Sequence, residues 1–320
     1  MSDLTAAYEN AVNAGGRSGA QILSGRSIHW RYAGKARPTQ RSDEPSLELA
    51  LQPFDNESLV VSPNADDVPA VARILVHGSQ ATADTCDFSD ADILVVLDDH
   101  REFTREEHIR TVRELRKLLQ RIYAFDPLMH HGLMWLPASA LDDYDEAFLP
   151  VETLRLSKVL FGPLSLQLSS RSSDAAISGP RLRLAAESLQ EQLIRRQHLR
   201  GDYHLKNFIS GILLLPSLFL ASKSIFVYKR ESFDLARSYF STEGWNFVAR
   251  AEEVRRQWLR PLDPWWKGAV ATLGHPRSRT LLSDVLPSRL NIMRPAQQAA
   301  LRALEKHADA FFRELEAALR

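Results

Sequence analysis

Residues 72–97 read ARILVHGSQATADTCDFSDADILVVL, and this stretch decides the fold. Two short apolar runs, Ala72–Val76 and Ile93–Leu97, are rich in β-branched residues and are bounded by glycine, serine and aspartate, as buried strands tend to be. A polar loop, Gln80–Ser89, separates them. We therefore expect two buried strands joined by a loop, with polar side chains gathered where the loop meets each strand.

Asp90 and Asp92 begin the second expected strand. Residues two apart in a strand point to the same face, so these carboxylates project side by side. Two neighbouring carboxylates repel, and burying them together is costly unless cations neutralise them. Magnesium is bound by one or two carboxylates together with substrate phosphates. The pair predicts a two-metal site for in-line phosphoryl displacement, with Mg²⁺ as the cofactor and Mn²⁺ as the alternative.

Gly78 and Ser79 follow the first expected strand. Glycine lets the backbone approach a phosphate closely, and serine offers hydroxyl and amide donors, so the two residues predict a triphosphate cradle. The alternative is ordinary turn chemistry, because Gly-Ser and Asp-x-Asp are each common in loops. Their combination at the junction of two apolar runs favours the functional interpretation.

In this order and spacing, with ten residues between Ser79 and Asp90, the segment resembles the signature of the polymerase β-type nucleotidyltransferases. The resemblance implies an enzyme that transfers a nucleoside monophosphate from an NTP, with ATP preferred, to a hydroxyl acceptor and releases pyrophosphate. It also implies that Gly78 and Ser79 bind the nucleotide, while Asp90 and Asp92 hold the metals and are catalytic.

The segment from Asp126 to Leu136 departs from the family pattern. The family usually places a third carboxylate on a later strand, where it serves as a base. Here the expected third strand, Met129–Leu136, contains no acid. Asp126, just before it, and His130 and His131 are the open candidates, of which we assign His131 to the catalytic set. Imidazole is a softer ligand than magnesium prefers, which favours a base or an acceptor contact. If none fills the role, the protein is a catalytically inactive module that binds nucleotide or a partner.

Helix signals lie on both sides of this segment. Thr104 and Glu107 form a capping box that opens a helix, and apolar residues in the range Ile109–Ile122 recur on one of its faces. From about residue 151 onward nearly every signal is helical, with clear helices at Leu182–Arg200 and Tyr203–Ser222.

Three polar residues of the helical part are candidates for nucleotide binding. Lys206 resembles in placement the helical lysine with which related enzymes contact the triphosphate; the alternative is an exposed surface lysine. Lys229 and Ser232 begin a further helix, whose N-terminus suits phosphates. Solvated charge is the alternative for these two.

The organisation follows from these signals. We expect an α+β fold: a polymerase β-type nucleotidyltransferase domain with a small mixed sheet at 49–165, then an all-helical domain at 180–320. Residues 1–48 are an N-terminal extension, and the Ser-rich stretch Ser165–Pro180 is the expected linker.

Composition narrows the setting and the acceptor. Lysine plus arginine and aspartate plus glutamate both number 40, so a long nucleic acid is a less favoured partner than a small molecule or a protein. The single cysteine, Cys86, fits a reducing cytoplasm. There is no signal-peptide pattern, and the most apolar stretch, Ile209–Ala221, is interrupted by Pro216 and is shorter than the roughly 20 residues that span a bilayer. We expect a cytoplasmic protein that does not insert into membranes.

Overall fold

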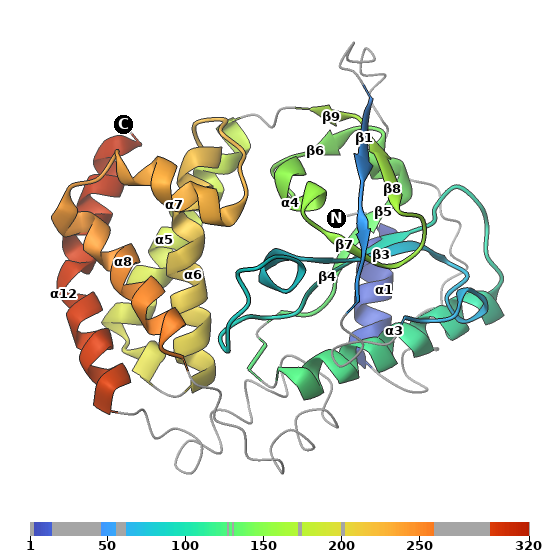
Figure 1. Ribbon diagram of the computed structural model, residues 1–320, viewed down its shortest axis with the longest axis horizontal. Helices are drawn as coiled ribbons and strands as arrows, with labels where there is room; N and C mark the ends of the chain where they lie inside the picture. The colour runs from blue at the N-terminus through green and yellow to red at the C-terminus, as the bar shows by residue number, and fades with distance from the viewer. Residues whose placement is uncertain are drawn as a thin grey trace.

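The chain forms a unit built on β-sheets followed by a unit built of helices, which appear side by side in the computed structural model (Figure 1). The structure describes residues 3–14, 46–55, 62–126, 128–129, 131–171, 175–199, 202–258 and 295–319. We call the described part up to residue 171 the sheet unit and the part from residue 175 the helical unit. The expected α+β class is confirmed.

A five-stranded mixed sheet forms the centre of the sheet unit. The central strands β3 and β4 are antiparallel, with His77 opposite Asp92, and β5 runs parallel to β4. This pairing brings the polar end of β3 next to the start of β4. In spatial order the strands are β2 (Gln52–Pro53), β7 (Lys158–Phe161), β3 (Val71–His77), β4 (Asp92–Leu97) and β5 (Met134–Pro137).

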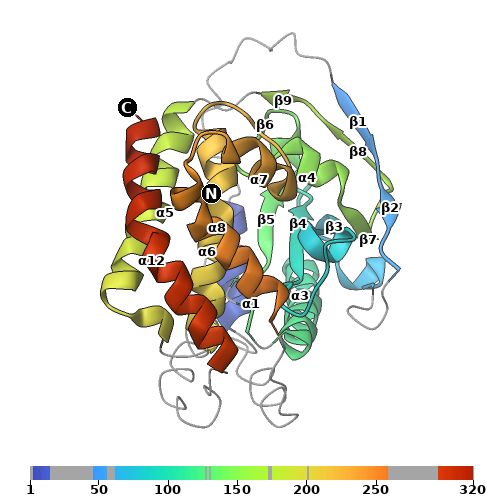
Figure 2. The same cartoon turned by 60° about the vertical axis from the view of Figure 1, so that its left-hand side comes forward.

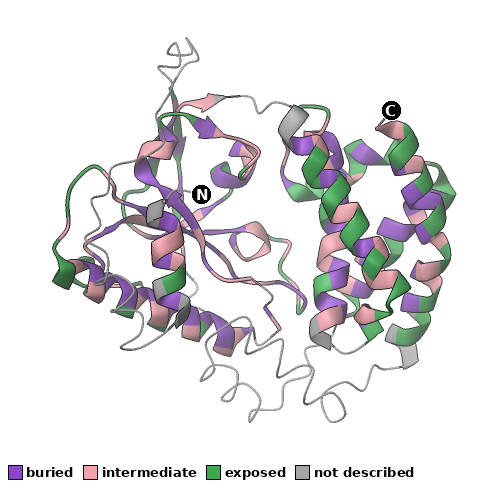
Figure 3. Cartoon of the chain, turned by 180° about the vertical axis from the view of Figure 1, so that it is seen from behind, coloured by how far each residue is buried: buried purple, intermediate pink, exposed green. Residues whose placement is uncertain are grey.

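The two central strands are buried on both faces, because their side chains alternate between two separate cores. Ile74 and Val95 face the core shared with α1 (Asp3–Ala14) and α3 (Arg105–Phe125). Leu75 lies in the core on the opposite face. Figure 3 shows that the strands of the sheet are mostly buried, with some residues of intermediate exposure. A rigid, two-sided core therefore supports the strand ends that carry the candidate site.

The helix α3 begins as the sequence predicts. Thr104 accepts from the backbone of Glu107, and the Glu107 carboxylate accepts from the Thr104 backbone, so the capping box is complete. Tyr8 of α1 is fully buried and hydrogen-bonded to Nδ1 of His108 on α3. The described part of the expected N-terminal extension therefore contributes a helix to the core of the sheet unit.

In the expected linker, Ser165–Pro180, the described residues form two short strands and the start of a helix, while residues 172–174 lie outside the described part of the chain. Leu166 and Leu168 alternate with exposed neighbours and are buried in the sheet unit, so the segment has the period-2 pattern of a strand. It pairs with β1 in an antiparallel register that joins Leu47 to Leu168. The elements outside the central sheet are β1 (Leu47–Ala50), η1 (Ala65–Asp67), η2 (Gly78–Ala81), η3 (Ala138–Leu141), β6 (Tyr144–Asp145), α4 (Val151–Arg155), β8 (Ser165–Leu168) and β9 (Ser170–Arg171).

The helical unit is organised around α6, which packs against α5, α7 and α8, while α12 runs along α8 (Figure 2). Within α6, the segment His204–Ala221 is long and apolar enough to cross a membrane by composition, but 56% of it is buried inside the protein, as in a core helix. The helices are α5 (Ala175–Ile194), η4 (Gln197–Leu199), α6 (Asp202–Ala221), α7 (Lys229–Arg237), α8 (Thr242–Arg256) and α12 (Pro295–Ala318).

Candidate active site

Gly78 lies directly against one of the two aspartates. It follows β3 with a φ of 68°, which glycine adopts without the steric cost that other residues meet. A Cβ atom at this position would lie 2.5 Å from Oδ2 of Asp92. Gly78 thus permits both the turn after β3 and the close approach of the Asp92 carboxylate, and Ser79 continues the turn in η2.

His131 is the side chain from the β5 side that reaches the aspartate pair. Its Nε2 lies 2.9 Å from Oδ1 of Asp92 and 3.7 Å from Oδ2 of Asp90. Strand β5 begins only at Met134, so the expected strand Met129–Leu136 was too long, and His131 lies in the irregular segment before it. His130 lies outside the described residues.

His131 and the carboxylate of Asp92 stabilise each other's charged forms. Burial lowers the pKa of His131, but the hydrogen bonds and charges of Asp90 and Asp92 outweigh burial and raise that pKa well above its usual value. Burial raises the pKa of Asp92, but the hydrogen bond and charge of His131 prevail and lower it. The two carboxylates therefore favour the protonated form of His131, which pairs with Asp92.

Lys206 reaches Asp90 from the helical unit. The expected alternatives for this lysine were a triphosphate contact and an exposed surface position, and in the structure its side chain is only 1% exposed. Its Nζ lies 2.5 Å from Oδ1 of Asp90 and 2.6 Å from Oδ2 of Asp126. Asp126, the residue that ends α3, is itself buried. Lys206 is thus an internal counter-ion for two carboxylates.

One ammonium is shared by two acids, and their pKa values reflect this. Burial alone lowers the pKa of Lys206, but Asp90 and Asp126 raise it, so the lysine is charged. Burial raises the pKa of Asp126 to about 6, against the attraction of Lys206 and with a further contribution from Asp90. Asp126 therefore carries its proton more readily than an ordinary aspartate.

The loop between the two site strands is anchored in the helical unit, where Figure 1 shows it extending toward α6. Phe88 is 4% exposed and belongs to the core of the helical unit. Its ring meets Trp258 edge to face, with 5.2 Å between centroids. Asp84 accepts hydrogen bonds from Arg230, at its carboxylate, and from Arg255, at its carbonyl. The loop position just before Asp90 is thus fixed by contacts that local sequence patterns do not reveal.

The two candidates at the start of α7 have different environments. Lys229 is solvent-exposed and lies within electrostatic reach of Asp92. Ser232 is fully buried, donates to the Lys229 carbonyl and accepts from Ser217. The structure brings Lys229 toward the aspartates and turns Ser232 into the helical core.

The aspartate pair fits a divalent cation that is also held by substrate. Oδ2 of Asp90 and Oδ1 of Asp92 converge on His131 Nε2, so two carboxylate oxygens already share one cationic partner. Within the described residues, no group of three or more histidine, cysteine, aspartate or glutamate side chains is arranged to hold a metal. Two protein carboxylates completed by phosphate oxygens match the way Mg²⁺ is bound.

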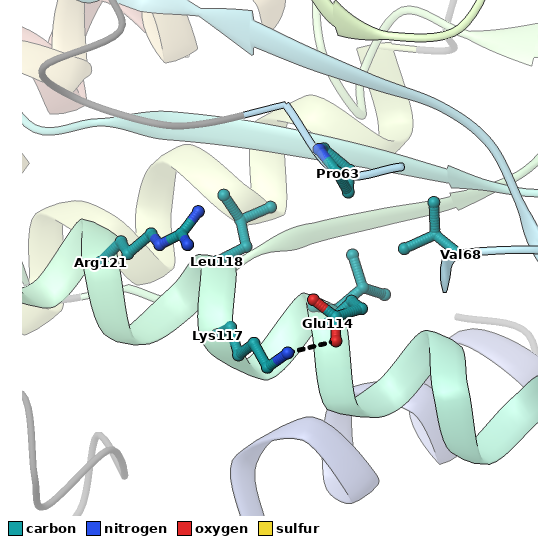
Figure 4. A pocket seen from close by; sticks show the side chains of 7 residues that line it. Pro63, Val68, Glu114, Lys117, Leu118 and Arg121 are labelled. Atoms are coloured by element: carbon teal, nitrogen blue, oxygen red, sulfur yellow. Dashed lines mark hydrogen bonds and ion pairs between the residues drawn. The ribbon is translucent and has the colours of Figure 1, made fainter. Parts of the chain in front are cut away.

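Two cavities lie away from the candidate site. The one in Figure 4 is about 20 Å³, room for roughly one water molecule, between α3 and the segment before η1. Lys117 and Glu114 form an ion pair on its rim. A second cavity of about 380 Å³ lies between η4 and α12, lined in part by Arg196 and Arg302. Neither is lined by a residue of the candidate site.

The start of β4 thus carries Asp92, with Asp90 just before it, beside the Gly78-Ser79 turn on a small mixed sheet. Residues 63–130 match the family model described as a nucleotidyltransferase domain. The chain therefore carries a nucleotidyltransferase domain, as the resemblance to the polymerase β-type superfamily implied. No curated protein and no solved structure matches the chain.

Proposed function

We propose that the protein is a metal-dependent nucleotidyltransferase that transfers a nucleoside monophosphate from an NTP, with ATP as the preferred donor, to a hydroxyl acceptor. The observation that carries the proposal is the convergence of Asp90 and Asp92 beside Gly78, inside a segment that matches a nucleotidyltransferase domain. General nucleotidyl transfer follows from the domain; donor, acceptor and metal are the proposed part.

In this proposal Asp90 and Asp92 would hold Mg²⁺, or Mn²⁺, on the side where both carboxylates now face His131. When bound, such an ion neutralises the charge that develops on the transferred phosphoryl group and its leaving group. Ser79 offers its hydroxyl and backbone amide to a phosphate at the start of η2. Lys229 places a second positive charge within electrostatic reach of Asp92. Together these residues orient the triphosphate with its α-phosphate toward the aspartates.

His131 takes the role that a third carboxylate has in the family. It approaches both aspartates from the β5 side, 2.9 Å from Asp92. Once those carboxylates are engaged by substrate and its counter-ion, a neutral Nε2 at this position can accept the proton of the acceptor hydroxyl. The oxygen then attacks the α-phosphorus, the bond to the β-phosphate oxygen breaks, and pyrophosphate leaves.

The acceptor is proposed to be a small molecule or a protein side chain, and the setting the cytoplasm. The chain has equal numbers of acidic and basic residues, and such a balance provides no overall attraction for a long nucleic acid. Its one cysteine, Cys86, is a free thiol, consistent with a reducing compartment.

The test compares Asp92→Asn with Asp98→Asn, an aspartate just beyond the other end of the same strand. Calorimetry measures binding of a non-hydrolysable ATP analogue with Mg²⁺, and pyrophosphate release is followed with ATP and a panel of hydroxyl acceptors that includes aminoglycosides. Asp92→Asn should lose roughly a hundredfold or more in metal-dependent release, while Asp98→Asn keeps wild-type values. Release that is unaffected by Asp92→Asn would remove the proposed site.

A second candidate function is a nucleotide-binding module without transfer. It is favoured by one observation: within the described residues of β5 there is no acid, so the base is not a carboxylate of that strand. This function predicts Mg²⁺-dependent binding of the ATP analogue together with no pyrophosphate release for any acceptor in the panel.

A further inference from the structure

Lys206 occupies a position between two carboxylates that resembles a cation site. Its Nζ is 2.5 Å from one oxygen of Asp90 and 2.6 Å from one oxygen of Asp126. The ring of Phe88 lies 5.5 Å from the same ammonium. A permanent positive charge thus lies directly against one oxygen of Asp90 and one oxygen of Asp126.

The contact also fixes the direction of the Asp90 carboxylate. Oδ1 of Asp90 is engaged by Lys206, while Oδ2 faces the His131 and Asp92 side. A carboxylate with one oxygen engaged in this way cannot rotate without breaking a short ion pair inside the protein. The exposed fraction of the Lys206 side chain is 1%, so water does not replace the contact. Lys206 therefore selects which Asp90 oxygen is presented to a ligand.

We propose that Lys206, held by Asp126, is a positioning residue that serves as a built-in second cation, so the active site takes one divalent ion per chain. The inference rests on the proposed function, because it concerns the cation bound by Asp90 and Asp92. It differs from a triphosphate contact, in which the ammonium would bind the substrate rather than the carboxylates.

The inference gives the helical unit a share in the site. Lys206 comes from α6, and Phe88, two residues before Asp90, inserts into the core around α6. The carboxylate of Asp90 and the loop that leads to it are thereby both held by contacts with α6 and the core around it. The nucleotidyltransferase domain holds the carboxylates, and the helical unit supplies the charge that one of them needs.

The test counts bound Mn²⁺ by electron paramagnetic resonance, titrating Mn²⁺ alone into the full chain. Three proteins are compared: wild type, Lys206→Ala and Lys206→Met. Alanine removes the charge and opens space between Asp90 and Asp126; methionine removes the charge and retains most of the volume. We expect one ion in wild type, two in Lys206→Ala, and one in Lys206→Met with affinity at least about tenfold tighter, since a unit charge beside Asp90 is gone.

The outcomes separate the two proposals. Two ions in wild type would overturn the built-in cation while leaving the proposed function intact. No ion in wild type, either with Mn²⁺ alone or with Mn²⁺ and a non-hydrolysable ATP analogue, would remove the metal basis of the proposed function, and this inference with it. One ion in all three proteins with unchanged affinity would reduce Lys206 to a structural role. Circular dichroism checks folding, and if Lys206→Ala does not fold, the wild-type count and the Lys206→Met affinity decide the question.

Discussion

Replacing Phe88 by alanine should destabilise the helical unit although Phe88 belongs to a loop of the sheet unit. The side chain is 4% exposed, so nearly all of its transfer free energy is gained on folding. The edge-to-face contact with Trp258 at 5.2 Å adds about 0.5–1.5 kcal/mol. Truncation of a buried phenylalanine to alanine costs about 3–5 kcal/mol, including the cavity left behind. We expect a loss in that range.

Urea unfolding followed by far-UV circular dichroism and by tryptophan fluorescence measures this loss. With a slope of roughly 3 kcal/mol per molar urea, the midpoint should fall by about 1 M or more. Phe88→Leu keeps most of the volume and should cost less than about 1.5 kcal/mol. Phe148→Ala is the matched control, because Phe148 is 36% exposed and its truncation should cost far less. A loss below about 1 kcal/mol for Phe88→Ala would refute the insertion of this loop into the helical core.

Three further outcomes follow from the site. The imidazole of His131 should titrate well above its usual pKa in histidine NMR spectra, and Asp92→Asn should lower that pKa. Because the pKa of His131 is raised in the folded protein, the stability that its protonation contributes is complete below about pH 6.5 and is lost as pH rises through the folded pKa. Unfolding measured across pH should show a contribution from Asp126 that falls between about pH 4 and about pH 6, since its pKa is raised to about 6, and Asp126→Asn should abolish that slope; an unchanged slope would contradict it. Gly78→Ala should cost at least about 1–2 kcal/mol of stability from its φ of 68° and weaken Mn²⁺ binding through collision with Asp92, so unaltered values of both would count against the close approach.

The parts of the fold that local patterns encode could be predicted. The short apolar runs rich in β-branched residues and their flanking polar residues located β3 and β4, and the capping box located the start of α3. Each of these signals depends on interactions between residues a few positions apart, so the local sequence alone is enough to predict the element. The match of residues 63–130 to a nucleotidyltransferase domain confirms the class of fold that they indicated.

The parts that depend on distant contacts could not be predicted. Ser165–Leu168 becomes a strand because β1, more than a hundred residues earlier, offers an edge to pair with. The burial of Lys206 depends on Asp126 and Asp90, which come from two other segments of the chain. A lysine on a helix gives no local sign of such partners, so the sequence left an exposed position open. Phe88 likewise resembles an ordinary loop residue until its pocket in the helical unit is known.

Contacts between residues far apart in the sequence set the order in which parts of the fold can form during synthesis. Tyr8 can bond to His108, and Leu47 can pair with Leu168, only after these later residues have been synthesised. Only when Lys206 emerges does Asp90 acquire its counter-ion. Since domains fold as units while the ribosome is still extending the chain, a nascent sheet unit would hold its aspartates without this compensation for a time. Among the charged side chains that contact Asp90, the ammonium of Lys206 is thus the last to be made.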